Sequence, residues 1–124
     1  MTTLTEKSYQ GDLILFEEDK DFSREVVTIA AGVDLTVGSV LGKVTANGKY
    51  SHSAPAAVDG SETPVAVLIE DAAAAAADAQ AVVLVRHARV RRSALVFEGT
   101  IDTVGERNTA VDALHAIGII AADA

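Results

Sequence analysis

Residues 37–50, VGSVLGKVTANGKY, constrain the fold more than any other part of the chain. Valine, leucine and threonine are interrupted there by glycines, a pattern that disfavours a helix and favours strands. Gly38 and Gly42 lie inside the apolar run, where a glycine typically marks a bulge or the close approach of another backbone. Asn47-Gly48 is the strongest short-range signal for a β-hairpin. The segment therefore predicts a β domain, and other parts of the chain must supply the function.

Several other segments extend the β prediction. Residues 25–30 (EVVTIA) are a second strand candidate, and residues 13–16 (LILF) either form the first strand of the core or belong to an extended arm. Residues 65–69 (VAVLI) are a continuous apolar run, which is typical of a strand buried on both faces. Residues 81–90 (AVVLVRHARV) are predicted as one long strand. Residues 53–63 are a predicted loop, and residues 71–81, with the alanine tract at 72–77, are predicted as a loop with at most one or two helical turns.

One helix is predicted near the end of the chain. Thr103 and Glu106 have the spacing of a capping box, and apolar residues then recur on one helical face. Gly118 suits the position just after a helix, where a left-handed conformation is common. The expected fold is therefore a single, mainly β domain with one short C-terminal helix over residues 103–117.

Length and composition restrict the class of protein. A chain of 124 residues fits one domain, and without cysteine it has no disulfide, thiolate metal site or thiol nucleophile. The net charge of −8 at pH 7 argues against non-specific nucleic-acid binding, which needs a positive field. The start does not resemble a signal peptide, and no apolar run reaches the roughly 18 residues of a membrane span. We therefore expect neither nucleic acid nor a membrane as a direct partner.

The sequence contains no obvious catalytic or metal-binding constellation. His52, His87 and His115 are far apart and lack the spacing of a zinc site. Ser39 lacks the flanking pattern of a hydrolase nucleophile, and the carboxylates of residues 17–21 are predicted to form a solvated run rather than a cleft. We therefore expect no enzymatic activity, no cofactor, no metal and no small-molecule substrate.

The basic residues are concentrated in one segment. Arg86, Arg89, Arg91 and Arg92 are four of the ten lysines and arginines in the chain. Arginine is favoured at protein interfaces, so one interpretation is contact with an acidic partner or a neighbouring subunit. The other interpretation is ordinary surface or intramolecular ion pairs, which stabilise a fold little.

The N-terminal segment differs in character from the rest of the chain. Three of the five aromatic residues, Tyr9, Phe16 and Phe22, lie within the first 25 residues, which is unusual for a solvated linker. Such a segment needs a surface to bury its aromatic side chains. We therefore expect residues 1–10 to form an arm that becomes ordered on a partner.

Two families resemble parts of this chain. The segment GSVLGKV is similar to a strand of biotinyl and lipoyl carrier domains, which carry Met-Lys-Met or Asp-Lys-Ala at the turn, where this chain has Asn47-Gly48-Lys49. The better resemblance is to the head decoration (capsid-stabilising) protein D family of lambda-like tailed bacteriophages. It rests on four segments in the family's order, SREVVTIAAG, VGSVLGKVTANGKY, AAVDGSETPVAVLIEDA and ADAQAVVLVRHARV.

This resemblance implies a β-clip or β-tulip-like fold, with an extended N-terminal arm at residues 1–22 and a β-rich decoration domain at residues 23–124. It implies a homotrimer that binds the outer surface of the expanded phage head and stabilises it. The partner would be the major capsid protein, and the location would be the virion, after assembly in the host cytoplasm.

The arm would add a strand to the capsid shell, because extended segments gain main-chain hydrogen bonds in this way. The residues expected to contact the capsid are Leu4, Tyr9, Leu13, Ile14 and Phe16. The arginines at positions 86, 89, 91 and 92 would contact a subunit or the capsid. Two alternatives stay open: a carrier domain with Lys43 or Lys49 as attachment point, and another trimeric virion accessory protein.

Overall fold

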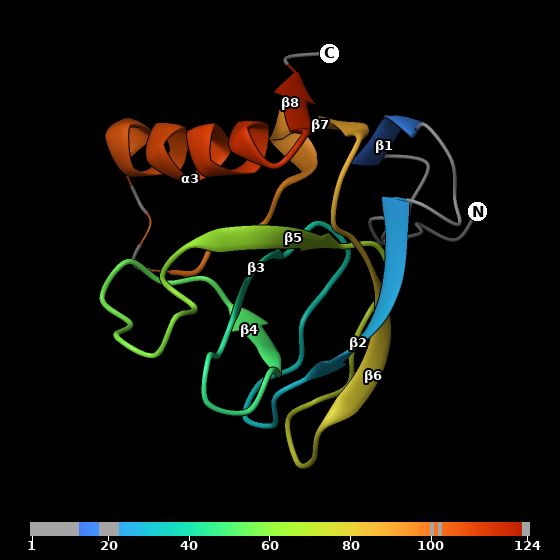
Figure 1. The fold of residues 1–124 in the computed structure, drawn as a ribbon, viewed down its shortest axis with the longest axis vertical. Coiled ribbons are helices and arrows are strands. Elements are labelled where there is room, and N and C mark those ends of the chain that lie inside the picture. The colour runs from blue at the N-terminus through green and yellow to red at the C-terminus, as the bar shows by residue number, and fades with distance from the viewer. Residues whose placement is uncertain (1–12, 18–22, 100, 102, 123–124) are drawn as a thin grey trace, which may run out of the picture.

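The computed structural model describes residues 13–17, 23–99, 101 and 103–122 (Figure 1). Within these ranges the chain forms eight strands, one 3-10 helix and one α-helix. The prediction of a single, mainly β domain with one short C-terminal helix is confirmed. In chain order the elements are β1 Ile14–Glu17, β2 Arg24–Ile29, β3 Val40–Lys43, β4 Tyr50–His52, β5 Pro64–Leu68, β6 Ala79–Leu84, β7 Ala88–Arg91, η1 Arg92–Ala94, α3 Val104–Ala116 and β8 Ile119–Ala122.

The strands form a small closed barrel and a separate three-stranded sheet. The barrel has the strand order β2-β4-β3-β5-β6, and the sheet has the order β1-β7-β8. The sheet lies at one end of the barrel, near the end of α3 (Figure 1). Because β7 pairs antiparallel with β1 and parallel with β8, this sheet joins the beginning of the described chain to its end.

The glycine-rich segment forms the β3–β4 hairpin that its sequence predicts. Lys43 and Tyr50 lie opposite each other, and Gly48 has a φ of +71° in the turn between them. A Cβ at Gly42 would lie 2.0 Å from the Ser61 carbonyl oxygen, and a Cβ at Gly38 would lie 2.1 Å from that of Ala94. Both glycines therefore allow a neighbouring backbone to lie directly against this segment.

Strand β5 separates two hydrophobic cores. Val67 belongs to the core beneath α3, together with Leu84, Leu114 and Ile119. Its neighbour Leu68 belongs to the second core, which the barrel strands form. Each face of β5 therefore contacts a different core, which explains its continuous apolar sequence. The prediction of a strand buried on both faces is confirmed.

The prediction of one long strand over residues 81–90 is wrong. The segment forms β6 in the barrel and β7 in the three-stranded sheet, and residues 85–87 separate them. The Val85 N–H donates to the Ser23 carbonyl oxygen at 2.9 Å, and His87 has a φ of +48°. Hydropathy does not reveal this change of sheet, because both strands contribute buried apolar residues.

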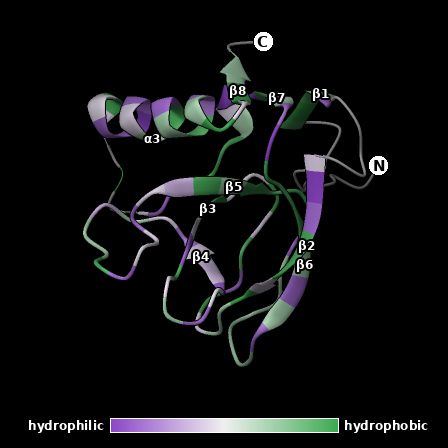
Figure 2. Ribbon diagram, viewed as in Figure 1, coloured by the Kyte–Doolittle hydropathy of each residue, from purple (hydrophilic) through white to green (hydrophobic). Residues whose placement is uncertain are grey.

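Helix α3 begins and ends as predicted. Thr103 Oγ1 accepts a hydrogen bond from the Glu106 N–H at 3.2 Å and donates one to the Glu106 carboxylate at 3.0 Å. Gly118, with a φ of +90°, follows the last turn. Hydrophobic and hydrophilic residues alternate along α3 (Figure 2), and its buried side packs against β5 and β8. Among the described helices, none has the length and apolar character to cross a membrane.

Asp78 links the residues after β2 to the β3–β4 hairpin. Its contribution to the stability of the fold depends on pH. Its carboxylate lies 2.5 Å from Lys49 Nζ and accepts a hydrogen bond from the Ala31 N–H at 2.8 Å. The hydrogen bond to Lys49, then that from Ala31, lowers the pKa of Asp78 below its ordinary value. A carboxyl group whose pKa is lower in the folded than in the unfolded chain stabilises the fold at pH values above the unfolded-state pKa. This stabilisation is lost as the pH falls through the folded-state pKa.

Asp78→Asn should therefore lower the free energy of unfolding at pH 7 and flatten its decline below about pH 4. Urea unfolding at pH 7, 5 and 3 measures both effects. The wild-type chain should lose more stability than the variant between pH 5 and pH 3. Parallel losses in the two proteins would contradict this prediction.

Candidate functional site on the three-stranded sheet

A row of exposed side chains crosses the three-stranded sheet. Phe16 on β1 lies opposite Arg89 on β7, and Arg89 lies opposite Ile120 on β8. All three are exposed, with 62% of Phe16 and 44% of Ile120 accessible to solvent. The row lines a shallow hollow of about 430 Å³, which we call the Phe16 surface. Its lining residues are Phe16, His87, Ala88, Arg89, Gly118 and Ile120.

A β-bulge in β1 determines that Phe16 faces outward. Ile14 pairs with Val90, whereas Phe16 pairs with Arg89, so the register shifts by one residue between them. Val90 is completely buried, and Ile14 packs against the same core. In an unbroken strand Ile14 and Phe16 would face the same side, because side chains alternate. The extra residue in the bulge turns Phe16 toward solvent.

Strand β1 is an edge of its sheet. Within the described residues it pairs with β7 only. The outer backbone groups of an edge strand are a template for pairing with another chain. Its most exposed side chain is aromatic, whereas protected edges commonly carry lysine or proline. The edge and the adjoining Phe16 surface together form a candidate protein-binding surface.

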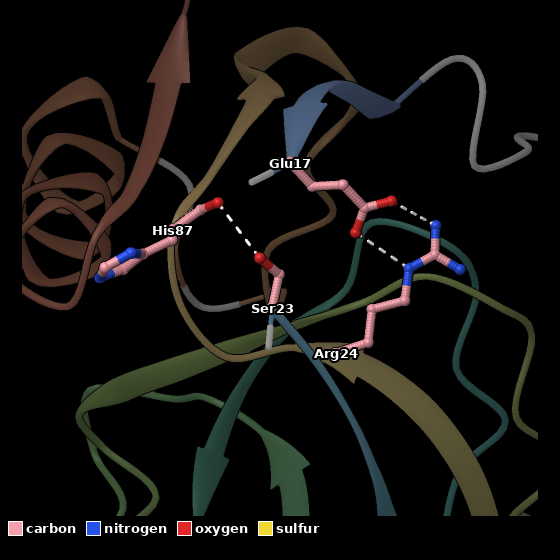
Figure 3. Close-up of polar contacts among 4 residues, drawn as sticks. All are labelled: Glu17, Ser23, Arg24 and His87. Carbon is pink, nitrogen blue, oxygen red and sulfur yellow. Dashed lines mark hydrogen bonds and ion pairs between the residues drawn. The ribbon is translucent and has the colours of Figure 1, made fainter. Parts of the chain in front are cut away.

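Polar contacts hold β1 against the barrel (Figure 3). The Arg24 guanidinium donates two hydrogen bonds to the Glu17 carboxylate, at 2.6 and 3.0 Å. The two side chains are only 22% and 13% exposed, and bidentate pairs of this kind are stronger than single ion pairs. Ser23 Oγ donates to the His87 carbonyl oxygen at 3.2 Å, which links the start of β2 to the β6–β7 connection. These contacts fix the neighbouring Phe16 relative to the barrel.

The residues predicted to contact the capsid differ in their positions. Leu4 and Tyr9 lie outside the described residues. Leu13 is completely buried, and Ile14 is partly buried against the same core, so both contribute to packing in this conformation. Phe16 presents most of its side chain to solvent. The interpretation of residues 13–16 as the first strand is confirmed, since β1 begins at Ile14.

The four clustered arginines lie in different surroundings and do not form one patch. Only Arg89 lines the Phe16 surface. Arg91 lies two residues further along β7 and is half-buried. The other two contact acidic or polar side chains of this chain: Arg86 lies 3.3 Å from Glu25, and Arg92 donates a hydrogen bond to Asn108.

No sequence signal identified Ile120 as part of the surface. Two isoleucines after Gly118 indicate a short strand-forming segment, but not its partner. Pairing with β7 places Ile119 in the core, completely buried, and Ile120 on the exposed face. Which of the two isoleucines is exposed therefore depends on the pairing of β8 with β7, and α3 separates these two strands in the sequence.

The chemistry of this surface is that of a protein contact. Aromatic and arginine side chains are enriched at interfaces, and Phe16 and Arg89 lie side by side in an open hollow. Within the described part of the chain, no three His, Cys, Asp or Glu side chains are placed to hold a metal ion. The barrel, the small sheet and its exposed edge thus define a small β protein with a surface suited to binding another protein.

Comparison with known families agrees with this class. Residues 3–119 match the family model described as bacteriophage lambda head decoration protein D. The chain therefore belongs to the lambda head decoration protein D family, a family of structural phage capsid proteins, and its place is the capsid of the virion. A search of curated protein sequences gave no match. The resemblance inferred from the ordered sequence segments is confirmed.

Proposed function

We propose that this chain binds the outer surface of the expanded phage head as a homotrimer, contacts the major capsid protein and stabilises the shell. Family membership supports association with the capsid. The observation that carries the specific proposal is the row of Phe16, Arg89 and Ile120 beside β1, which pairs only with β7 among the described residues. Three copies acting together would raise the avidity, because each further contact becomes intramolecular.

The proposed arm leads directly into this surface. Residues 14–17 are anchored in the sheet by pairing with β7 and by the Glu17–Arg24 ion pair. An arm that precedes β1 would therefore start from a fixed point next to Phe16. We propose that its backbone pairs with a strand of the shell, while Leu4 and Tyr9 set the register.

The carrier-domain alternative has no support in the hairpin. Carrier domains present their lysine at the turn with a defined tripeptide that this chain lacks, and here Lys49 forms an ion pair with the Asp78 carboxylate at 2.5 Å. Lys43 lies near the Tyr50 ring, 6.0 Å from its centroid. The measured mass of the intact protein should equal that of the unmodified chain.

Phe16→Thr tests the proposed capsid contact directly. Threonine keeps the strand propensity of β1, and Phe16 is too exposed for its loss to affect folding much. Burial of a large side chain at an interface contributes about 1.5–3 kcal/mol, so affinity for heads should fall about tenfold or more. Co-sedimentation with purified expanded heads that lack this protein measures the occupancy.

Val58→Thr provides the matched control for Phe16→Thr. Val58 is 96% exposed and belongs to the loop between β4 and β5. Figure 1 shows this loop on the opposite side of the molecule from β1. This variant should bind heads like the wild-type chain. Equal occupancy by the two variants would contradict a role for Phe16.

A further inference from the structure

A second hollow lies at the other end of α3 from the Phe16 surface. It has a volume of about 260 Å³, and its lining residues come mainly from the loop before β5 and the first half of α3. It is smaller than the roughly 300–1,000 Å³ of pockets for drug-sized ligands, so a single side chain fits it better. We call it the Glu62 pocket. Its walls include Pro55, Pro64, Ile101 and Ala110, and two carboxylates, Glu62 and Glu106.

The Glu62 carboxylate is incompletely satisfied. Its Oε1 accepts a hydrogen bond from the Gly60 N–H at 3.3 Å, whereas its Oε2 is buried and has no hydrogen-bond partner. Among the described residues no other buried side-chain nitrogen or oxygen lacks a partner. A buried carboxylate oxygen without a donor is costly. A rotation of the Glu62 carboxyl group that turns Oε2 toward the pocket, where a ligand N–H donates to it, would remove that cost.

The second carboxylate comes from a different element of the fold. Glu106 belongs to the first turn of α3, where its Oε1 accepts a hydrogen bond from Thr103 Oγ1 at 3.0 Å. Glu62 belongs to the loop before β5. The pocket lining therefore combines two carboxylates from different elements with apolar side chains, in a chain whose net charge is −8.

We propose that the Glu62 pocket receives one arginine side chain of a protein partner. A guanidinium carries five N–H donors in a planar fork and can reach two carboxylates at once. The aliphatic stem of arginine would pack against the proline and alanine walls. Because the pocket holds a single side chain, the partner presents this arginine from a protruding segment. The pocket is separate from the Phe16 surface, so the proposal does not depend on the capsid contact made there.

NMR titration of the ¹⁵N-labelled full chain tests the proposal with N-acetyl-arginine N-methylamide as probe. We expect saturable shifts of the Gly60, Glu62 and Thr109 amide signals, with a dissociation constant in the millimolar range that suits one side chain. The citrulline analogue has the same shape without the charge. It should bind at least about fivefold more weakly, because charge-assisted hydrogen bonds are the stronger kind.

Variants separate the pocket from general electrostatic attraction. Glu62→Gln should weaken binding of the arginine probe at least about fivefold. Asp112→Asn makes the same charge change at an exposed position of α3 outside the pocket and should leave the affinity unchanged. Ala113→Leu narrows the pocket but keeps both carboxylates, so it should abolish the saturable shifts even if Glu62→Gln alters the loop.

Three results would overturn the proposal. The first is an absence of saturable shifts at Gly60, Glu62 and Thr109 with the arginine probe. The second is equal affinity for the arginine and citrulline probes. The third is equal affinity of Glu62→Gln and Asp112→Asn for the arginine probe.

Discussion

Removal of residues 1–10 should abolish decoration of expanded phage heads while leaving the domain folded. The described core begins at Leu13, so the deletion removes none of its buried residues. It does remove the proposed strand pairing and the side chains of Leu4 and Tyr9. Each loss of 1.4 kcal/mol is tenfold in affinity, and in the proposed homotrimer three arms would act together, so affinity should fall by at least about hundredfold.

Sedimentation of heads incubated with the truncated chain measures the bound fraction. Circular dichroism and urea unfolding should match the full chain, and sedimentation equilibrium should show the same oligomeric state as the full chain. Full-length chain with Leu4 and Tyr9 both changed to serine separates side-chain contacts from backbone pairing, and Thr2→Ser is its control. Unchanged occupancy by the truncated chain would defeat the arm hypothesis.

Gly42→Ala should lower the free energy of unfolding by about 3 kcal/mol or more, although it adds only one methyl group. The added Cβ would lie 2.0 Å from the oxygen, 2.5 Å from the carbon and 2.6 Å from the Cα of Ser61, all backbone atoms. The Ser61 segment cannot easily move away. Ser61 is buried, and its N–H and hydroxyl donate to the Asp59 carboxylate at 3.0 and 2.6 Å.

Gly105→Ala is the matched control for Gly42→Ala. A Cβ at Gly105, in the first turn of α3, meets no atom within 4 Å. Because alanine is the better helix former, this change should be neutral or stabilise by up to about 1 kcal/mol. Urea unfolding of both variants measures the difference. Equal unfolding midpoints would show that the backbone contact at Gly42 is not needed.

Features with local causes were predictable. The close backbone approach at Gly42 follows from the position of a glycine inside an apolar strand. The start of α3 follows from the spacing of Thr103 and Glu106, which lie three residues apart. The burial of β5 on both faces follows from its continuous apolar sequence. In each case the residues that determine the structure are neighbours in the sequence.

Features that depend on pairing were not predictable. The hydropathy pattern of residues 81–90 does not distinguish one strand from two, because both β6 and β7 contribute buried apolar residues. The bulge that turns Phe16 outward is visible only in its register against β7. The Glu62 pocket joins a loop to a helix that is distant in the sequence, and no local motif records that contact.

The sequence by itself therefore determined the class of this protein: its β character, its closing helix and its likeness to the head decoration family. Only the tertiary structure decided which side chains reach solvent together, as Phe16, Arg89 and Ile120 do. The physical reason is that the alternation of side chains along a strand defines its two faces, but does not determine which face other elements pack against. The covered face is set by partners that are distant in the chain and meet only on folding.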